Sequence, residues 1–588
     1  MNDQKNMILA IVLSIVILVV FETFFNTGRT PQPPAEQTAA QTNPQSPAAT
    51  PAIPTQGSQS HIPAAPTGAP VNTEQMIQQS RKAALQSVQR ITINAPRLHG
   101  SIALKGGVID DVTLSDYHQT VDKKSPEIVV LSPRGSSDAY FAGYGWTGDK
   151  GQPMPGLDTM WTADRDTLTA DKPVTLTWDN GHGLIFKRII SVDANFMFSV
   201  EQQVENTTDK PLTLYPFSLL SRYGTPETTN FYILHEGMLG VIDGKLQEIK
   251  YEDLKDEEQA ATPAETTGGW IGITDKYWLA TLIPNQTDKV QTRFIYRKEG
   301  LVDVYQADYL GAAVVVPAGG SGSSKSHVFA GAKEVNLLDN YAEKFGIINF
   351  DLAIDFGWFY FLTKPIFLAL LWIHSMVGNL GISILLLTVA IKTLFFPLAN
   401  KSYTSMSKMK KLQPQMVKLR ERFAEDKVKL NQEMMALYKR EKVNPASGCL
   451  PILLQIPVFF SLYKVLFVTI EMRQAPFFGW IHDLSVPDPT TLFNLFGLIN
   501  YTPPHFLMIG IWPLIMGVTM FLQQRLNPQP ADPIQAKIFL FMPIFFTFLL
   551  AKFPAGLVIY WAWNNTLSIL QQWVIMKRMG IKAKEALS

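Results

Sequence analysis

The chain contains a single cysteine, Cys449, among its 588 residues. One cysteine excludes an intrachain disulfide framework, and its place at the start of an apolar run predicts a buried structural thiol. The sequence also lacks a GxxxxGK[ST] phosphate loop, so a pump driven by nucleotide hydrolysis is not expected. Its nine histidines are scattered, without an HExxH motif or another metal-ligand spacing. No cofactor and no metal site is therefore expected.

Charge is balanced over the whole chain but not along it. The formal net charge is only +1, yet residues 401–442 hold twelve Lys or Arg against five Asp or Glu. More basic residues follow Val574, namely Lys577, Arg578, Lys582 and Lys584. The segment 471–504 has one basic residue, Arg473. Because basic segments remain in the cytosol, both termini are expected inside and this loop outside.

The first 90 residues contain little that could form a packed core. Residues 1–26 hold an unbroken apolar run, with neither a small-x-small cleavage motif nor a lipobox-like cysteine, which predicts an uncleaved signal-anchor span. Residues 27–90 are rich in Pro, Ala, Gln and Thr and nearly free of bulky side chains up to about Thr73. This composition predicts a flexible linker. A short polar helix is expected at its end, over Glu74–Gln89.

Short segments of alternating polarity fill residues 91–335. KPVTLTW, LIFKRIISV and FMFSVEQQV each show period two, and each is followed by a turn rich in Asx or Gly. Such segments predict a large antiparallel β-sandwich, and its position after one span places it outside the membrane. The acidic stretch Glu252–Glu265 is expected to be a solvated loop.

Long apolar segments dominate the remainder. Residues 345–377 mix aromatic side chains with Lys364, Pro365 and His374, which predicts an amphipathic helix in the membrane interface, or alternatively a core helix. Residues 378–588 then hold five candidate spans: Gly378–Leu398, Leu450–Ile470, Leu507–Gln523, Ile538–Phe553 and Gly556–Val574. The fourth is short for a hydrocarbon core of about 30 Å, which favours local thinning of the bilayer.

Lys392 lies inside the first of these five spans. A cation in hydrocarbon costs at least about 2.5–3.5 kcal/mol, so it needs a polar cavity, a partner or a route to the surface. Thr388 lies one turn earlier on the same helix face. One interpretation is a hydrophilic site within the bilayer that attracts acidic groups. The other is snorkelling, because the cytosolic end of the span is only about 10 Å away.

Polar side chains also mark the last span. Trp561, Asn565, Ser568 and Gln572 are spaced i, i+4, i+7 and i+11 and therefore share one helix face. Gln455 in the second candidate span and Thr547 in the fourth add further polar atoms. Each of them could simply bond two helices together. In combination with Lys392 they favour an aqueous groove.

The basic segment 400–443 has the pattern of a helical hairpin. An apolar stripe steps by three or four residues along Met406, Met409, Leu412, Met416, Leu419 and Phe423, and Met434 and Leu437 continue it after a break near Ala424–Lys427. The predicted basic outer surface consists of Lys408, Lys410, Lys411, Lys418, Arg420 and Arg422. Either these charges only enforce topology, or they recruit anionic partners such as ribosomal RNA, lipid headgroups or acidic chains.

Four stretches of the second half are long enough to identify a family. They read SMSKMKKLQPQ, QEMMALYKREKVNPASGCLPILLQIPVF, EMRQAPFFGWIHDLS and KFPAGLVIYW. Together they resemble the YidC membrane-protein insertase family over about Phe350–Met579. The amino-terminal anchor and the β-domain resemble the Gram-negative branch of that family.

The resemblance implies a polytopic α-helical protein of the bacterial inner membrane, with a five-helix insertase core and a periplasmic β-supersandwich. It also implies a groove open to cytosol and lipid, in which Lys392 stands where the family has an arginine. Tyr560 and Trp561 stand where the family has two tyrosines, and Thr388 matches a threonine that contacts substrate. The implied partners are nascent membrane proteins, the ribosome, the Sec translocon and membrane lipids, but no DNA.

The expected function is that of an insertase and chaperone, not of an enzyme. It would move nascent segments from the cytosol into the membrane without nucleotide hydrolysis. The alternative is a solute transporter with Lys392 as its binding-site cation, although no internal repeat typical of transporters is evident. The β-domain could bind carbohydrate or a partner, or serve only as a scaffold.

Overall fold

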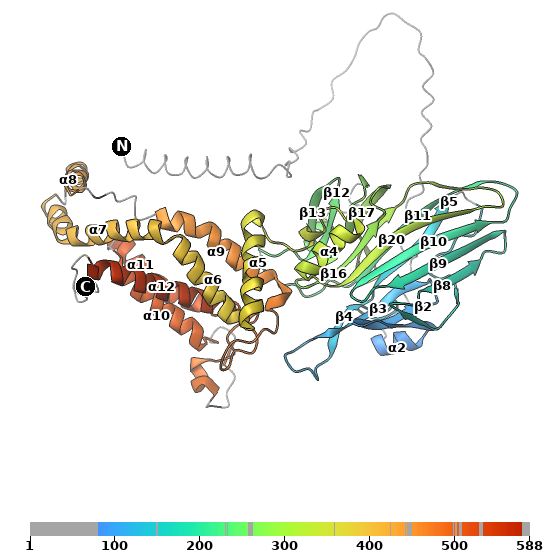
Figure 1. Cartoon of the computed structure of the whole chain (residues 1–588), viewed down its shortest axis with the longest axis horizontal. Coiled ribbons are helices and arrows are strands. Elements are labelled where there is room, and N and C mark those ends of the chain that lie inside the picture. Colours follow the sequence, from blue (N-terminus) through green and yellow to red (C-terminus); the bar gives the residue numbers. More distant parts are fainter. Residues whose placement is uncertain are drawn as a thin grey trace, which may run out of the picture.

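A computed structural model describes residues 80–578, except 149–150, 230, 232, 257–262, 358, 424, 442, 444–449, 498, 500–502, 505–507 and 528–532. The predicted signal anchor, most of the predicted linker, Cys449 and the last ten residues therefore lie outside the described residues. The described chain forms a β-domain followed by a helical part (Figure 1). Helix α5 stands between the two in Figure 1.

Two large sheets form the β-domain. The first contains, in spatial order, β14 (Ala264–Thr267), β17 (Lys289–Glu299), β18 (Val302–Leu310), β11 (Leu212–Tyr223), β5 (Tyr140–Gly148), β3 (Val108–His118), β2 (Leu98–Ala103), β1 (Arg90–Asn94) and β7 (Thr167–Thr169), with β19 (Val314–Val316) beside β11 and β4 (Glu127–Leu131) beside β3. The second contains β13 (Lys245–Lys250), β12 (Gly237–Ile242), β15 (Trp270–Thr274), β16 (Trp278–Pro284), β20 (Ser321–Ala332), β10 (Met197–Asn206), β9 (Leu184–Val192), β8 (Val174–Asp179) and β6 (Thr162–Ala163). The predicted β-sandwich is confirmed, and its three quoted segments form β8, β9 and β10.

Strand β9 shows why the alternating pattern indicated a sandwich. Every second residue is buried, beginning with Leu184 and Phe186. Arg188 occupies a core position in the same alternation and donates to the carbonyl oxygens of Gly106, Gly107 and Tyr144. These three hydrogen bonds offset the free-energy cost of removing the guanidinium from water. This buried arginine thus connects the second sheet to segments of the first.

Three local expectations for the β-domain need correction. The sheets are not wholly antiparallel, because β1 pairs with β7 in parallel. The short polar helix is α2 (Arg81–Gln86), since Ser80 caps its first turn by accepting from the Ala83 N–H. The acidic stretch begins as helix α3 (Tyr251–Asp256) rather than as a loop. Its Tyr251 and Leu254 are buried, which holds this turn on the sheet.

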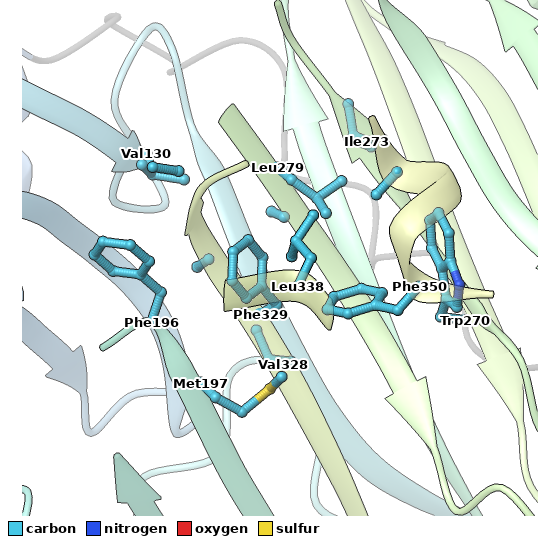
Figure 2. Packing of buried hydrophobic residues seen from close by; sticks show 14 of the residues in the cluster. Val130, Phe196, Met197, Trp270, Ile273, Leu279, Val328, Phe329, Leu338 and Phe350 are labelled. Atoms are coloured by element: carbon cyan, nitrogen blue, oxygen red, sulfur yellow. The ribbon is translucent and has the colours of Figure 1, made fainter. Parts of the chain in front are cut away.

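Helix α4 (Val335–Phe345) and the 3₁₀ helix η2 (Phe350–Ala353) close the end of the β-domain. Figure 2 shows Leu338 of α4 and Phe350 of η2 among the side chains of the sheet. The Phe350 ring lies edge-on, 5.6 Å from the ring of Trp270 and 5.7 Å from that of Phe329. Aromatic burial of this kind fixes the chain that leads into the helical part.

The helical part consists of α5 (Tyr360–Val377), α6 (Leu380–Leu394), α7 (Phe396–Arg422), α8 (Lys427–Arg440), α9 (Leu450–Val468), α10 (Ile511–Leu526), α11 (Pro533–Leu550) and α12 (Ala555–Arg578). Two short 3₁₀ helices, η4 (Ile470–Met472) and η5 (Leu492–Gly497), lie in the loop between α9 and α10. The first candidate span, Gly378–Leu398, contains α6 and the first residues of α7, and each of the other four corresponds to one helix. Helix α12 packs along both α10 and α6, and α11 packs on α10.

By length and composition, α5 is the described helix that could cross a membrane by itself. Helices α6 and α7 qualify only as a pair, and they meet at an angle of 71°. The shorter apolar helices are Gln455–Val468 and Lys537–Leu550.

Helix α5 differs from the amphipathic helix expected over residues 345–377. Its exposed face is apolar and includes Phe361, Leu368 and Trp372. Its one ammonium, on Lys364, lies 2.9 Å from an Asp339 carboxylate oxygen and 3.2 Å from one of Asp351. The charge of this helix is therefore bound to the end of the β-domain and does not form a polar helix face.

The predicted hairpin is formed by α7 and α8, which pair through a small apolar cluster. Leu412, Met416, Leu437 and Val443 are buried in it, and Met409, Leu419, Met434 and Tyr438 pack around them. The break falls where it was expected, because α7 ends at Arg422 and α8 begins at Lys427. Asp426 caps α8 by accepting from the Lys429 N–H.

Candidate functional site

Lys392 lies in the last turn of α6, facing α12. Its Nζ donates to the Ser568 hydroxyl oxygen at 2.7 Å. The Ser568 hydroxyl in turn donates to the carbonyl oxygen of Asn564, one turn earlier in α12. A cation near the carbonyl end of a helix is also favoured by the helix dipole. These contacts orient the ammonium toward the interior of the bundle.

A cavity of about 230 Å³ opens beside this ammonium. Its polar lining consists of Lys392, Tyr403, Gln455, Gln523, Asn564 and Ser568. Its apolar lining consists of Phe395, Leu398, Ala399, Ile456 and Phe459. Five helices, α6, α7, α9, α10 and α12, contribute to these walls. We call this space the Lys392 cavity.

The Lys392 cavity has polar groups but no acidic counterion. Among the described residues, no carboxylate lies within ion-pair distance of Lys392, and its ammonium donates to a neutral hydroxyl. The side-chain amide oxygen of Asn564, which also lines this cavity, is buried and has no hydrogen-bond partner among the described residues. A desolvated ammonium and an unused acceptor are both costly unless something polar meets them. The arrangement is therefore suited to a ligand that brings a negative charge.

Aromatic side chains form one wall near the cavity. The indole of Trp561 stacks on the Phe459 ring, with a centroid distance of 5.5 Å and an interplanar angle of 15°. Tyr560 is buried and makes a side-chain hydrogen bond with Gln455. The two adjacent aromatic residues therefore have different surroundings, because consecutive positions on a helix point in different directions.

Several predicted site residues lie elsewhere. Thr388 is buried and donates to the Ile384 carbonyl oxygen of its own helix, so it does not line the cavity. Gln572 donates to the carbonyl oxygen of Leu526 and to the side chain of Asn527 at the end of α10. Asn565 is buried but is not part of the lining. The polar face predicted for the last span is thus divided among different neighbours.

Three polar lining residues, Tyr403, Gln523 and Asn564, and all five apolar ones were not predicted. Tyr403 lies near the start of α7 and Gln523 near the end of α10, where a polar residue normally indicates only a helix end. Asn564 lies one position before a predicted residue, and its direction depends on how α12 is rotated. The adjacent pair Asn564 and Asn565 was a usable signal, because two amides in one span seldom both face lipid.

The basic residues of the hairpin have two kinds of surroundings. Lys408, Lys411, Lys418 and Arg422 are exposed, and Arg420 is partly buried. Lys410 instead donates to the carbonyl oxygen of Arg525 at 2.8 Å. It therefore connects the hairpin to the end of α10.

The β-domain and the helical part share a dense interface at the opposite end of the bundle. Lys464 of α9 forms an ion pair with Asp355 at 2.7 Å and also donates to the carbonyl oxygen of Ile233. The Phe231 ring packs edge-on, 5.0 Å from that of Phe467. Gln474 donates to the His118 carbonyl oxygen at 2.8 Å. Polar and aromatic contacts together hold the two parts against each other.

No group of three or more potential metal ligands occurs within the described part of the chain.

Comparison with known proteins agrees with the two-part architecture. The family model described as the YidC periplasmic domain matches residues 90–369, and the model described as the 60Kd inner membrane protein matches residues 372–583. A membrane protein insertase YidC of Methylobacterium sp. strain 4-46 is 52% identical over 604 residues, which cover 99% of this chain and 96% of the relative. The protein of the same description from Bradyrhizobium diazoefficiens is 50% identical over 606 residues, covering 99% and 98%.

A solved structure of an active YidC insertase, with its first transmembrane domain resolved, covers 82% of this chain and 92% of that one. The identity is 18% and the TM-score is 0.35. Two family models and nearly full-length relatives at about half identity settle the assignment. The chain therefore belongs to the YidC family of membrane protein insertases, inner-membrane proteins with a periplasmic domain that are not enzymes.

Proposed function

We propose that this chain inserts segments of nascent membrane proteins into the inner membrane through the Lys392 cavity, without nucleotide hydrolysis. The observation that carries the proposal is the Lys392 ammonium, directed into a cavity of about 230 Å³ and bonded to the neutral Ser568 hydroxyl. An acidic side chain near the translocated end of a substrate would supply the missing counterion. Opposite charges about 4 Å apart attract by about 4 kcal/mol at an effective dielectric constant of 20.

Release would follow from burial of the substrate in lipid. Helix α11 presents a broad apolar surface that includes Ile538, Phe541, Ile544, Phe545 and Phe548, each exposed. Ile456 and Phe460 add exposed apolar area on α9. A segment leaving the cavity along these faces gains about 0.8 kcal/mol for each CH₂ group that enters hydrocarbon. That gain would exceed one transient ion pair.

The site residues would act at different stages. Gln455, Trp561 and Ser568 would meet a substrate together with Lys392. The other members of the proposed groove neither line the cavity nor stack on its wall, and they would contact a substrate only after the bundle opens: Thr388, Tyr560, Asn565 and Gln572. In this scheme the signal anchor and five spans, α6, α9, α10, α11 and α12, cross a thinned bilayer, with both chain termini in the cytosol.

The α7–α8 hairpin would be the recruiting surface. Its exposed basic residues suit ribosomal RNA or anionic headgroups, whose attraction is long-ranged and salt-dependent. The ribosome and the Sec translocon are the proposed partners at this stage. Binding of ribosomes that carry a stalled membrane-protein chain should weaken when Lys408, Lys411 and Lys418 are all replaced by glutamine. Unchanged ribosome binding would mean that these charges serve only to fix the topology.

Charge reversal at Lys392 tests the central proposal. Lys392→Glu should reduce insertion of substrates with acidic translocated tails by at least about tenfold, because attraction becomes repulsion. Lys392→Arg should retain activity, and Lys439→Glu on exposed α8 is the matched control. Insertion is measured by protease protection of a radiolabelled substrate in proteoliposomes. Normal insertion of the acidic substrate by Lys392→Glu would contradict the electrostatic account.

Photo-crosslinking tests the proposed route separately. A crosslinker at Ile456, which lines the cavity, or at Trp561 should capture a stalled nascent span. A crosslinker at Val518, exposed on α10 but outside the lining, serves as control. Equal capture from all three positions would mean that substrates do not follow the Lys392 cavity.

A further inference from the structure

A second cavity, of about 430 Å³, lies where the β-domain meets the helical part. It is lined by Tyr117, Glu334, Asn336, Leu371, Ile470, Glu471 and Arg473. These residues come from β3, the start of α4, helix α5 and the segment that follows α9. We call it the interface cavity. It lies at the end of the bundle opposite the basic hairpin.

One carboxylate of the interface cavity lacks a cation. Glu471 accepts from the backbone N–H of Val335 at the start of α4, but its Oε2 is buried without a hydrogen-bond partner among the described residues. Glu334 is different, because Arg97 donates to both of its oxygens and the Tyr117 hydroxyl donates at 2.6 Å. Burial, with a further contribution from Glu334, raises the pKa of Glu471 to about 7. Glu471 therefore retains an unused acceptor.

One cation of the same cavity lacks a carboxylate. The Arg473 guanidinium donates to the backbone oxygens of His118 and Gln119 and lies 5.4 Å from the Trp278 ring. No carboxylate in the described chain lies within ion-pair distance of it. Two backbone acceptors leave some of its five N–H donors available. Guanidinium is also well matched to phosphate oxygens.

The cavity adjoins an apolar helix face. Leu371 of α5 lines it, and the same helix exposes Phe361, Leu368 and Trp372, whose exposed fractions are 62%, 44% and 66%. Such a face on the outer side of a membrane protein is suited to acyl chains. The site thus combines a free cation, a free carboxylate and an adjacent lipid-facing surface.

We propose that the interface cavity binds the headgroup of a phospholipid with a primary ammonium, such as phosphatidylethanolamine, in the outer leaflet. Arg473 contacts the phosphate, and Glu471 accepts an N–H from the ammonium. A choline headgroup carries the same charges but has no N–H to donate, so it leaves the Glu471 acceptor unsatisfied. The acyl chains continue along the exposed face of α5. The bound lipid then connects the β-domain to the bilayer.

The test uses the full-length protein in nanodiscs of equal parts phosphatidylethanolamine and phosphatidylcholine. Native mass spectrometry after detergent release should show retained phosphatidylethanolamine in excess of phosphatidylcholine. Glu471→Gln should reduce that preference by about tenfold, the value of one hydrogen bond to a charged group. Arg473→Gln should reduce retention of both lipids. Glu343→Gln, on the exposed side of α4, is the matched control.

Equal retention of the two lipids by the unaltered protein would overturn the proposal without any variant, so a misfolded variant cannot obscure the outcome. Unchanged preference in Glu471→Gln would also overturn it. Competition with soluble glycerophosphoethanolamine shows whether the cavity binds the whole lipid or only its headgroup. It is expected not to displace the lipid, and displacement at millimolar concentration would refute the contribution of the α5 face. Capture of a substrate span by a crosslinker at Leu371, in place of lipid, would likewise refute lipid binding.

Discussion

Two lysines of the helical part, Lys392 and Lys464, occupy opposite ends of the bundle with very different partners. The Lys464 ammonium has a carboxylate, that of Asp355, at 2.7 Å and a backbone carbonyl, that of Ile233. The Lys392 ammonium has the hydroxyl of Ser568 at 2.7 Å. The same side chain is thus neutralised where the β-domain docks and left with a neutral partner at the proposed insertion site.

The contrast separates a structural ammonium from a functional one. An ion pair between two parts of a fold restrains their relative position, and its removal leaves a carboxylate without a partner. An ammonium beside a cavity restrains little, but it can attract a charge from another molecule. Replacing Lys464 should therefore affect stability, and replacing Lys392 should affect insertion.

The largest effect on stability is expected for Lys464→Ala. It should lower the free energy of unfolding by about 2–3 kcal/mol, because Asp355 loses its cation and the Ile233 carbonyl loses its donor. Lys392→Ala should change stability by less than about 1 kcal/mol, since only a hydroxyl loses its partner. Denaturant unfolding in detergent micelles measures both. Equal destabilisation by the two variants would remove the distinction.

A double variant sharpens the same comparison. Adding Asp355→Asn to Lys464→Ala should restore part of the lost stability, because no unpaired carboxylate remains. Strict additivity of the two single effects would mean that Lys464 stabilises the interface through its packing and not through the ion pair.

A pH-dependent effect is expected from the unpaired carboxylate of the interface cavity. The pKa of Glu471 is raised from 4.5 to about 7 in the folded chain, so folding disfavours its ionised form. Its contribution is therefore favourable at low pH and is lost as the pH rises from about 4.5 through about 7, at up to 1.36 kcal/mol per pH unit. Glu471→Gln should flatten this part of the pH–stability curve. Identical curves for the two proteins would contradict the assignment.

The smallest effect concerns Lys410, an intermediate case with a backbone carbonyl as partner. Lys410→Ala should lower the free energy of unfolding by about 1 kcal/mol, because the hairpin loses its hydrogen bond to the Arg525 carbonyl. It should also increase hydrogen exchange in α8. The exposed Lys408→Ala is the control and should leave exchange unchanged. Equal exchange in both variants would mean that the apolar cluster around Leu412 and Leu437 positions the hairpin alone.

Local patterns predicted much of this molecule. Alternation with turn residues identified β8, β9 and β10, and a stripe of period 3.6 with a break identified the α7–α8 hairpin. Lys392, a lysine inside an apolar span, lines a cavity with polar walls, and its role there stays a prediction. Each of these signals depends on residues that are close in sequence, where spacing determines the direction of a side chain.

Contacts between distant segments were beyond such patterns. Nothing near Lys464 in sequence indicates that Asp355 and Ile233 would surround it, and nothing near Glu471 indicates the start of α4. Thr388 lies on α6, where its hydroxyl donates to the Ile384 carbonyl of the same helix. The parallel pair β1–β7 was missed for the same reason, since partner choice in a sheet depends on the whole fold.

The 71° corner between α6 and α7 has a consequence for timing. The corner lies close to Lys392. Helix α7 has 27 residues, so at 1.5 Å per residue its far end lies about 40 Å from this corner. An extended polypeptide covers that distance with about 12 residues. A nascent chain delivered at the tip of the hairpin would therefore have to extend by about a dozen residues before its leading acidic group could meet the Lys392 ammonium. The length of one helix would set the delay between arrival and insertion.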